Sequence, residues 1–328
     1  MRVAFFVHPG RSEAYEIAHR ATSWLSRREH VGIIPQQGAE SWAEIRHLFA
    51  NVLHDGVDLA VSLGGDGTML RTVELSLEAS VPVPVLGVNM GTLGYLTEVS
   101  SSELEVALEK YLNGDYEIEE RMTLEVDVER SAPGANGDAV HRDAMSAEDS
   151  AKVVDTGAGA GAKAEAEAVL GGPAGLSHLP SLVLNEAVVE KTFPGRTVRM
   201  DVSISGTPFL TYAADGLIVA TPTGSTAYNL SVRGPIVSPR VSAVIVTPVS
   251  PHMLFDRSLV LEPGEEILIK LVDGRSAELV LDGFPALELM PGDCVSCRSG
   301  SRPARLVAFR QRDFHAILKA KFALSKEQ

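Results

Sequence analysis

The stretch DLAVSLGGDGTML, residues 58–70, decides the fold expected for the N-terminal part of the chain. Apolar residues up to Leu63 predict a short buried strand, and the glycines after it predict a tight turn before a helix over 69–78. Such a turn commonly holds a phosphate on backbone N–H groups. Yet Asp66 stands within the turn, where its charge opposes a phosphate at ~4 Å by about 1 kcal/mol in water. The presence of a carboxylate in this turn therefore calls for a chemical explanation.

Strand and helix patterns alternate on both sides of this stretch. Two strand patterns and three helix patterns are clear: RVAFFV (2–7), VPVLGVN (83–89), and helices over 12–28, 41–56 and 101–114. This alternation predicts a doubly wound parallel sheet, in which ligands bind beyond the carboxyl ends of the strands. Both GGDGT and NMGTLGYL (89–96) fall at such ends. We expect residues 1–115 to form an α/β nucleotide-binding domain.

From residue 116 onward the chain shows successive short strand patterns, most of them separated by turns rich in Gly, Pro and Asp. Examples are TLEVDVE (123–129), SLVLNEAVVE (181–190) and EILIKLV (266–272). The pattern predicts an all-β, β-sandwich-like domain over 116–310. A final helical pattern over 311–325 is expected to pack back on the first domain.

Residues 131–178 interrupt the second domain with a segment of different composition. The segment is rich in Ala, Gly, Glu and Asp and contains no Phe, Tyr or Trp. It lacks the apolar surface needed to offset the entropy cost of ordering. We interpret it as a low-complexity surface insertion, and a regulatory or partner-binding role stays open.

Charge and hydropathy narrow the possible partners. The formal net charge of −14 argues against nucleic acid and anionic membranes, which both favour a basic face. No apolar run approaches the ~18 residues of a membrane span, and the apolar stretch at the N-terminus is too short for a signal peptide. We therefore expect a cytoplasmic protein.

Cys294 and Cys297 lie three residues apart in a strand pattern. Such residues point to opposite faces of a strand, and no further ligands for zinc stand nearby in the sequence. We predict ordinary strand residues and no protein metal site.

Two more motifs carry polar groups at the ends of apolar runs. NEAVV (185–189) places Asn185 and Glu186 where a carboxylate is costly to bury without a partner. TPTGSTAYNLS (221–231) predicts the start of a short helix, whose N–H groups and hydroxyls suit sugar or phosphate oxygens. Together with GGDGT these motifs indicate a site for a phosphorylated ligand.

In the order and spacing of its motifs the chain resembles the NAD kinases, as an actinobacterial-like member with an internal insertion. The motifs are GGDGT (64–68), NMGTLGYL (89–96), NEAVV (185–189), DGLIVATPTGSTAYNLS (215–231) and VTPVSPHML (246–254). They cover nearly the whole chain except the insertion. GGDGT alone also occurs in phosphofructokinases and in diacylglycerol and sphingoid-base kinases.

The resemblance implies phosphoryl transfer from ATP or polyphosphate to the 2′-hydroxyl of the adenosine ribose of NAD, giving NADP, with Mg²⁺ as cofactor. Asp66 would accept the proton of that hydroxyl, which is the chemical reason for its place. A homodimer or homotetramer is also implied. The residues that the resemblance places at NAD and the donor are Gly64, Gly65, Gly67, Thr68, Arg71, Asn89, Asn185, Glu186, Arg196, Asp215, Thr223, Ser225, Thr226, Ala227, Tyr228, Asn229, Leu230 and Ser231.

Two alternatives stay open at this point: a diacylglycerol-type lipid kinase and a non-catalytic NAD sensor. Such lipid kinases usually carry Asn-Glu directly after GGDGT, where this chain has MLRTVEL (69–75), and a sensor is expected to lose Asp66 before its glycines. The chain also departs from its relatives at the periphery of the pocket. Ala213 replaces a frequent basic residue, Arg233 replaces the first Gly of a Gly-Gly pair, and some relatives place a glutamine near Phe284.

Overall fold

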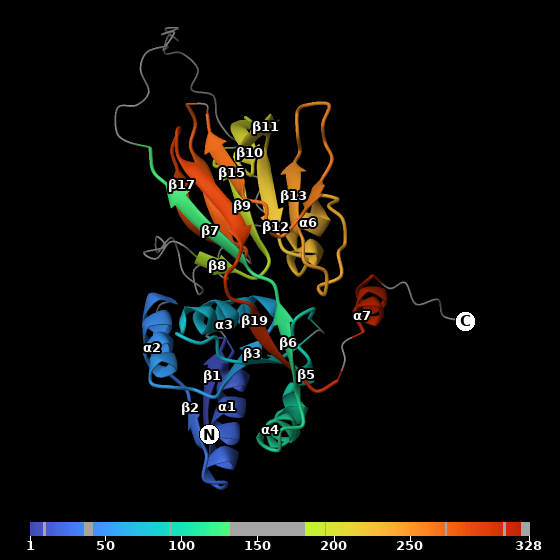
Figure 1. Cartoon of the computed structure of the whole chain (residues 1–328). Helices are drawn as coiled ribbons and strands as arrows, with labels where there is room; N and C mark the ends of the chain where they lie inside the picture. Colours follow the sequence, from blue (N-terminus) through green and yellow to red (C-terminus); the bar gives the residue numbers. More distant parts are fainter. Residues whose placement is uncertain are drawn as a thin grey trace, which may run out of the picture.

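The structure is a computed structural model that describes residues 1–8, 11–35, 42–91, 94–131, 181–193, 195–272, 274–310 and 313–322. The predicted insertion over 131–178, except for Ser131, lies outside the described residues. The chain forms an α/β part and an all-β part. Figure 1 shows the α/β part at the bottom and the all-β part at the top.

The α/β part is built on one mixed sheet with helices on both faces. Its strands are β1 (Arg2–Val7), β2 (Val31–Ile33), β3 (Leu59–Gly64), β4 (Val85–Asn89), β5 (Val99–Ser100), β6 (Glu117–Arg121) and β19 (Ala304–Ala308). Its helices are α1 (Ser12–Ser26), α2 (Trp42–His54), α3 (Asp66–Glu78), the 3₁₀ turn η1 (Ser101–Glu103) and α4 (Leu104–Leu112). Side chains of α1 and α4 pack on one face of the sheet and those of α2 and α3 on the other. The predicted doubly wound architecture is confirmed.

This sheet includes two strands from beyond residue 115, β6 and β19. The order is β2-β1-β3-β4-β19-β6, with β5 also on β4. Strand β19 pairs parallel to β4 and antiparallel to β6, although β19 comes from near the end of the chain. These strands cover an edge of β4 that would otherwise present unpaired backbone groups. The sheet thus extends past the predicted boundary between the two domains.

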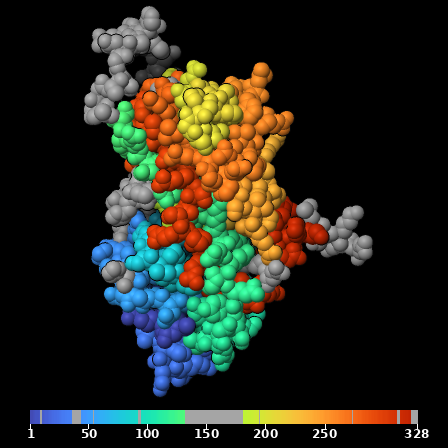
Figure 2. Space-filling view, viewed as in Figure 1, coloured from blue at the N-terminus to red at the C-terminus, as the bar shows by residue number. Residues whose placement is uncertain are grey.

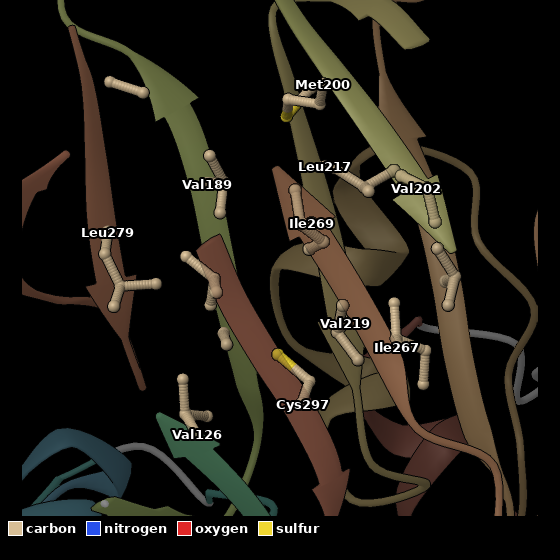
Figure 3. Close-up of a cluster of buried hydrophobic side chains, with 14 of the residues drawn as sticks. Val126, Val189, Met200, Val202, Leu217, Val219, Ile267, Ile269, Leu279 and Cys297 are labelled. Atoms are coloured by element: carbon tan, nitrogen blue, oxygen red, sulfur yellow. The ribbon is translucent and has the colours of Figure 1, made fainter. Parts of the chain in front are cut away.

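The all-β part consists of two six-stranded antiparallel sheets packed face to face, which confirms the β-sandwich-like prediction. One sheet holds β11 (Thr207–Ala214), β10 (Val198–Ile204), β15 (Ile267–Leu271), β18 (Cys294–Ser299), β7 (Leu124–Glu129) and β8 (Ser181–Val183). The other holds β14 (Leu259–Leu261), β13 (Val244–Val249), β12 (Gly216–Ala220), β9 (Glu186–Lys191), β16 (Ala277–Leu281) and β17 (Phe284–Leu289). Between them, buried side chains such as Val126, Ile269, Val219 and Leu279 face one another (Figure 3).

The two cysteines behave as ordinary strand residues of β18. Cys297 is fully buried among the side chains between the sheets (Figure 3), and Cys294 is partly exposed. Burial alternates along this strand, so the two thiols lie on opposite faces.

The described residues form three further short helical elements: η2 (Gly224–Thr226), α6 (Tyr228–Ser231) and α7 (Phe314–Lys321). Asp313 caps α7 by accepting a hydrogen bond from the backbone N–H of Ala316 at 3.0 Å. The Lys321 ammonium lies 5.2 Å from the Tyr95 ring centroid, which brings α7 to a loop of the α/β part. Among the described residues, no helix combines the length and the apolar character that a membrane crossing requires.

Candidate active site

Helix α3 begins at Asp66 itself, earlier than the predicted start at residue 69. The fully buried strand β3 ends at Gly64, and the chain enters the helix after Gly65. Asp66 therefore lies in the first helical turn, where the positive end of the helix dipole favours a carboxylate. At Gly64 a Cβ would meet the Thr68 hydroxyl oxygen at 2.2 Å, so the turn also needs a glycine for packing.

The Asp66 carboxylate joins the helix start to the loop over 94–96. Its Oδ2 accepts a hydrogen bond from the backbone N–H of Tyr95 at 2.8 Å, and its Oδ1 accepts one from Leu96 at 3.0 Å. A Cβ on Gly94 would lie only 2.1 Å from Oδ1, so only glycine permits this approach. Both oxygens retain a lone pair for a ligand. The same loop is fastened at its start, where the Asn89 side chain donates to and accepts from the backbone of Gly91.

Asn185 lies in a break between β8 and β9, and Glu186 is the first residue of β9, whereas the sequence predicts one continuous strand over 181–190. The Glu186 side chain is buried, and its Oε2 has no hydrogen-bond partner among the described residues. Burial, followed by the nearby Asp282 carboxylate, raises the pKa of Glu186 to about 8, while the Tyr228 N–H lowers it. Glu186 is thus largely protonated at neutral pH.

The residues of η2 and α6 divide into two groups. Ser225 and Asn229 are buried and hold the fold together: the Ser225 hydroxyl donates to the carbonyl of Pro222, and Asn229 Oδ1 accepts from the Thr247 hydroxyl at 2.7 Å. Gly224 is buried as well, whereas Thr226, Tyr228, Leu230 and Ser231, and Ala227 between the two elements, are partly or fully exposed. Close packing joins this turn to the NEAVV segment, because a Cβ on Gly224 would lie 2.1 Å from the Asn185 carbonyl oxygen.

A pocket of about 430 Å³ lies where the two parts of the chain meet. Five predicted site residues line it: Asp66, Asn185, Thr223, Thr226 and Ala227. Twelve residues that were not among the predicted site residues complete the lining: Tyr95, Leu96, Glu119, Arg121, Pro222, Ser238, Pro239, Arg240, Asp313, Phe314, His315 and Ile317. Asp66 and Asn185, which are 119 positions apart in the chain, thus share one cavity.

Five of the lining residues that were not predicted come from β6 and α7, and three more come from the segment 238–240. Arg121 is buried, pairs with Glu119 at 3.0 Å and donates to the Thr223 hydroxyl at 3.5 Å, so it links the two parts of the chain. Figure 2 shows the red surface of α7 beside the gold surface of the all-β part, and Phe314, His315 and Ile317 of α7 line the pocket. Tyr95 and Leu96 belong to NMGTLGYL, so their motif was a usable signal.

Several predicted site residues lie outside this pocket. Arg71 is buried against the Phe284 ring and paired with Glu74 at 2.8 Å, and Asp215 is paired with Lys191 at 2.6 Å. Arg196 lies in a separate hollow of about 540 Å³ that Lys191 also lines. The remaining predicted residues outside the lining are Gly64, Gly65, Gly67, Thr68, Asn89, Glu186, Ser225, Tyr228, Asn229, Leu230 and Ser231.

Two family models match the chain, the ATP-NAD kinase N-terminal domain over residues 3–116 and the ATP-NAD kinase C-terminal domain over residues 184–309. The NAD kinase of Heliobacterium modesticaldum is 36% identical over 323 residues, which cover 97% of each chain. The chain belongs to the NAD kinase family. Another NAD kinase, from Geobacter metallireducens, is 35% identical over 98% of this chain and 97% of its own. As an NAD⁺ kinase the chain is an enzyme, which decides against the lipid kinase and the sensor.

Two solved structures share the fold of this NAD kinase. Yeast NADH kinase complexed with NADH superposes with a TM-score of 0.75 at 23% identity, covering 100% of this chain and 89% of its own. An NAD kinase from Archaeoglobus fulgidus in complex with ATP has a TM-score of 0.66 at 22% identity. The match covers 99% of this chain and 100% of that chain.

Replacing Glu186 by Gln should flatten the pH dependence of thermal stability. The native state keeps the Glu186 proton up to about pH 8, whereas the unfolded chain loses it near pH ~4.3. The free energy of unfolding of the wild type therefore falls as pH rises between these values. Gln cannot ionise. At pH 8.5 the Glu186→Gln variant should therefore melt at least about 4 °C higher than wild type, whereas at pH 4.5 the two proteins should have the same melting temperature.

Thermal denaturation across this pH range measures the effect. Glu117→Gln, which changes an exposed glutamate, is the matched control and should stay within about 1 °C of wild type at every pH. A Glu186→Gln variant that melts below wild type at pH 8.5 would contradict a raised pKa.

Proposed function

We propose that the pocket between the two parts of the chain binds NAD and the phosphoryl donor together, and that Asp66 accepts the proton of the 2′-hydroxyl. The observation that carries this proposal is the shared cavity of Asp66, from the α/β part, and Asn185, from the all-β part. One wall carries Asp66, which stands in the glycine turn suited to phosphates, and the other supplies amide and hydroxyl groups suited to a nucleoside.

Asp66 is held ready for this role by its own hydrogen bonds. The N–H groups of Tyr95 and Leu96 keep the carboxylate oriented, at 2.8 and 3.0 Å. Phosphoryl transfer through a loose transition state needs positioning of the acceptor more than a strong base. An oriented carboxylate supplies this by aligning the hydroxyl and taking its proton as the new P–O bond forms.

The glycines beside Asp66 leave room for a ligand. An ideal Cβ on Gly65 or Gly67 would meet no described atom within 4 Å, and neither residue has a positive φ. Neither the described packing nor the backbone conformation therefore demands glycine there. We assign the free space to the dinucleotide and the donor phosphates, whose close approach a side chain would obstruct.

We assign the other wall to the acceptor. Asn185, Thr223 and Thr226 line the pocket and offer amide and hydroxyl groups to ribose oxygens. Glu186 and Tyr228 directly follow the lining residues Asn185 and Ala227 in the chain, and the Tyr228 N–H donates a hydrogen bond to the Glu186 carboxyl. Arg71 and Arg196 stay weaker candidates for substrate contact, since one is buried against Phe284 and the other lies in the separate hollow.

Magnesium fits this pocket as an ion bound to the donor phosphates. Among the described residues no three His, Cys, Asp or Glu side chains come together as a metal site. Mg²⁺ typically binds phosphates with only one or two carboxylates, and the lining offers Glu119 and Asp313 besides Asp66. The ion would neutralise the negative charge of the donor phosphates, which the Asp66 carboxylate repels. The cytoplasmic location stays a prediction from the hydropathy of the chain, and a homodimer or homotetramer stays a prediction from the family resemblance.

Purified protein supplied with NAD⁺, ATP and Mg²⁺ should form NADP⁺, measured through a dehydrogenase that accepts only NADP. Omitting Mg²⁺ should abolish the signal. Parallel reactions with polyphosphate as donor and with NADH as acceptor define the substrate range. Failure to form NADP⁺ from either donor, with NAD⁺ still binding, would overturn the proposal.

A further inference from the structure

One carboxylate, that of Asp282, fastens the backbone at the break between β8 and β9. Its Oδ2 accepts a hydrogen bond from the N–H of Leu184 at 2.8 Å, and its Oδ1 accepts from Asn185 at 2.7 Å and Glu186 at 3.1 Å. Burial raises the pKa of Asp282 to about 6, so at pH 8 the group is ionised and accepts hydrogen bonds only. Bonds to a charged acceptor are about twice as strong as neutral ones.

The turn that carries Asp282 is built for this contact. Asp282 and Gly283 connect β16 to β17 with φ values of 50° and 82°, the left-handed pair of a two-residue hairpin turn that favours Asn-Gly or Asp-Gly. The Asp282 N–H also donates to the Glu186 carbonyl at 3.0 Å. Backbone and side chain of one turn residue therefore hold the same three-residue segment.

The next residue after the turn connects this hairpin to helix α3. The guanidinium carbon of Arg71 lies 3.3 Å from the centroid of the Phe284 ring, and Arg71 is buried there. Helix α3 begins at Asp66, so the hairpin contacts both the element that carries Asp66 and the segment that carries Asn185. These are the two sides of the pocket.

We propose that Asp282 is a positioning residue for the acceptor side of the site, which holds Asn185 at its place in the pocket through the backbone over 184–186. Asp282 is not among the described residues that line the pocket, so it acts through Asn185 rather than on the substrate. The inference rests on the proposed function, in which Asn185 contacts the dinucleotide. Small displacements of positioning groups are costly in such sites, because about 1 Å can change rates by ~10²-fold.

Asp282→Asn tests the proposal, because asparagine suits the left-handed turn but cannot accept all three N–H bonds. We expect the KM for NAD⁺ to rise about tenfold at pH 8, and the KM for ATP to change less than about threefold. A second variant, Asp282→Gly, keeps the turn and removes the carboxylate altogether, and it carries the same test should the first be insoluble.

Asp293→Asn is the matched control, since Asp293 is also a buried aspartate at a turn of the all-β part. It accepts backbone N–H bonds from Met290 and Ser131, both at 2.9 Å, and lies outside the pocket lining. Its loss should lower the melting temperature and leave the KM for NAD⁺ within about twofold of wild type. Equal changes in KM for NAD⁺ in the two variants would show that Asp282 is merely structural and overturn the proposal.

A double-mutant cycle with Asn185→Ala separates this inference from the proposed function. If Asp282 acts through Asn185, the double variant should have nearly the KM for NAD⁺ of Asn185→Ala alone. Additive effects would overturn the positioning role. An unchanged KM for NAD⁺ in Asn185→Ala would instead refute the assignment of Asn185 in the proposed function.

Discussion

Replacement of Asp66 by Asn is expected to lower turnover by ~10²–10⁴-fold, while NAD⁺ still binds. An amide cannot take the proton of the 2′-hydroxyl, although it nearly keeps the shape of the carboxylate. The structure adds a second consequence, because Asp66 accepts N–H bonds from Tyr95 and Leu96. Asn can keep only one acceptor oxygen there, so a modest fall in melting temperature, equivalent to about 1–3 kcal/mol, accompanies the loss of turnover.

Steady-state turnover, NAD⁺ titration and thermal denaturation separate the two consequences. Asp293→Asn again provides the control, because it loses a carboxylate that accepts backbone N–H bonds and is not part of the pocket lining. It should lose stability and keep turnover. If Asp66→Asn retained more than a tenth of wild-type turnover, the role of proton acceptor would be wrong.

Replacement of Gly224 by Ala is expected to have the second-largest effect, with turnover reduced by ~10²-fold and a clear loss of NAD⁺ affinity. The added Cβ would lie 2.1 Å from the carbonyl oxygen and 2.5 Å from the carbonyl carbon of Asn185. These are backbone atoms, and the Thr221 N–H also donates to that carbonyl at 2.8 Å. The two segments must therefore move apart, which displaces Asn185 from Thr223 and Thr226 in the pocket.

Gly264→Ala is the control for this substitution, since a Cβ at Gly264 meets no described atom within 4 Å. It should leave turnover, NAD⁺ affinity and melting temperature close to those of wild type. Steady-state kinetics and NAD⁺ titration of both variants measure the difference. Unchanged kinetics in Gly224→Ala would mean that the close contact with Asn185 does not set the geometry of the pocket.

Local patterns were sufficient for most of the α/β part. The buried strand before GGDGT and the helix after it are β3 and α3, because an apolar run and a glycine turn are short-range signals. The start of α3 at Asp66 was not predicted, and neither were the hydrogen bonds that the Asp66 carboxylate accepts from Tyr95 and Leu96, about thirty residues away. Similarly, β19 joins the first sheet through a pairing with β4 across more than 200 residues.

The site, like the fold, has residues that local patterns predicted and residues that only distant contacts bring in. GGDGT and NEAVV pointed to Asp66 and Asn185, and both line the pocket. Nothing in the local sequence singled out Arg121, which reaches Thr223 of the other part of the chain, or Asp282. An aspartate followed by glycine predicts only a turn. The backbone N–H groups that its carboxylate binds are set by the tertiary packing of the strands around the turn.

By itself, the sequence determined the family, the two-part architecture and the chemistry that Asp66 offers, because motif order, hydropathy period and residue type are properties of the chain alone. Only the tertiary structure decided that predicted strand 181–190 breaks at Asn185, and that Glu186 is buried with a carboxyl oxygen lacking a described partner. It also decided that Ser225 and Asn229 serve the fold while α7 borders the pocket. The physical reason is that burial, hydrogen-bond partners and pKa depend on contacts between residues far apart in the chain, and local propensity carries no information about them.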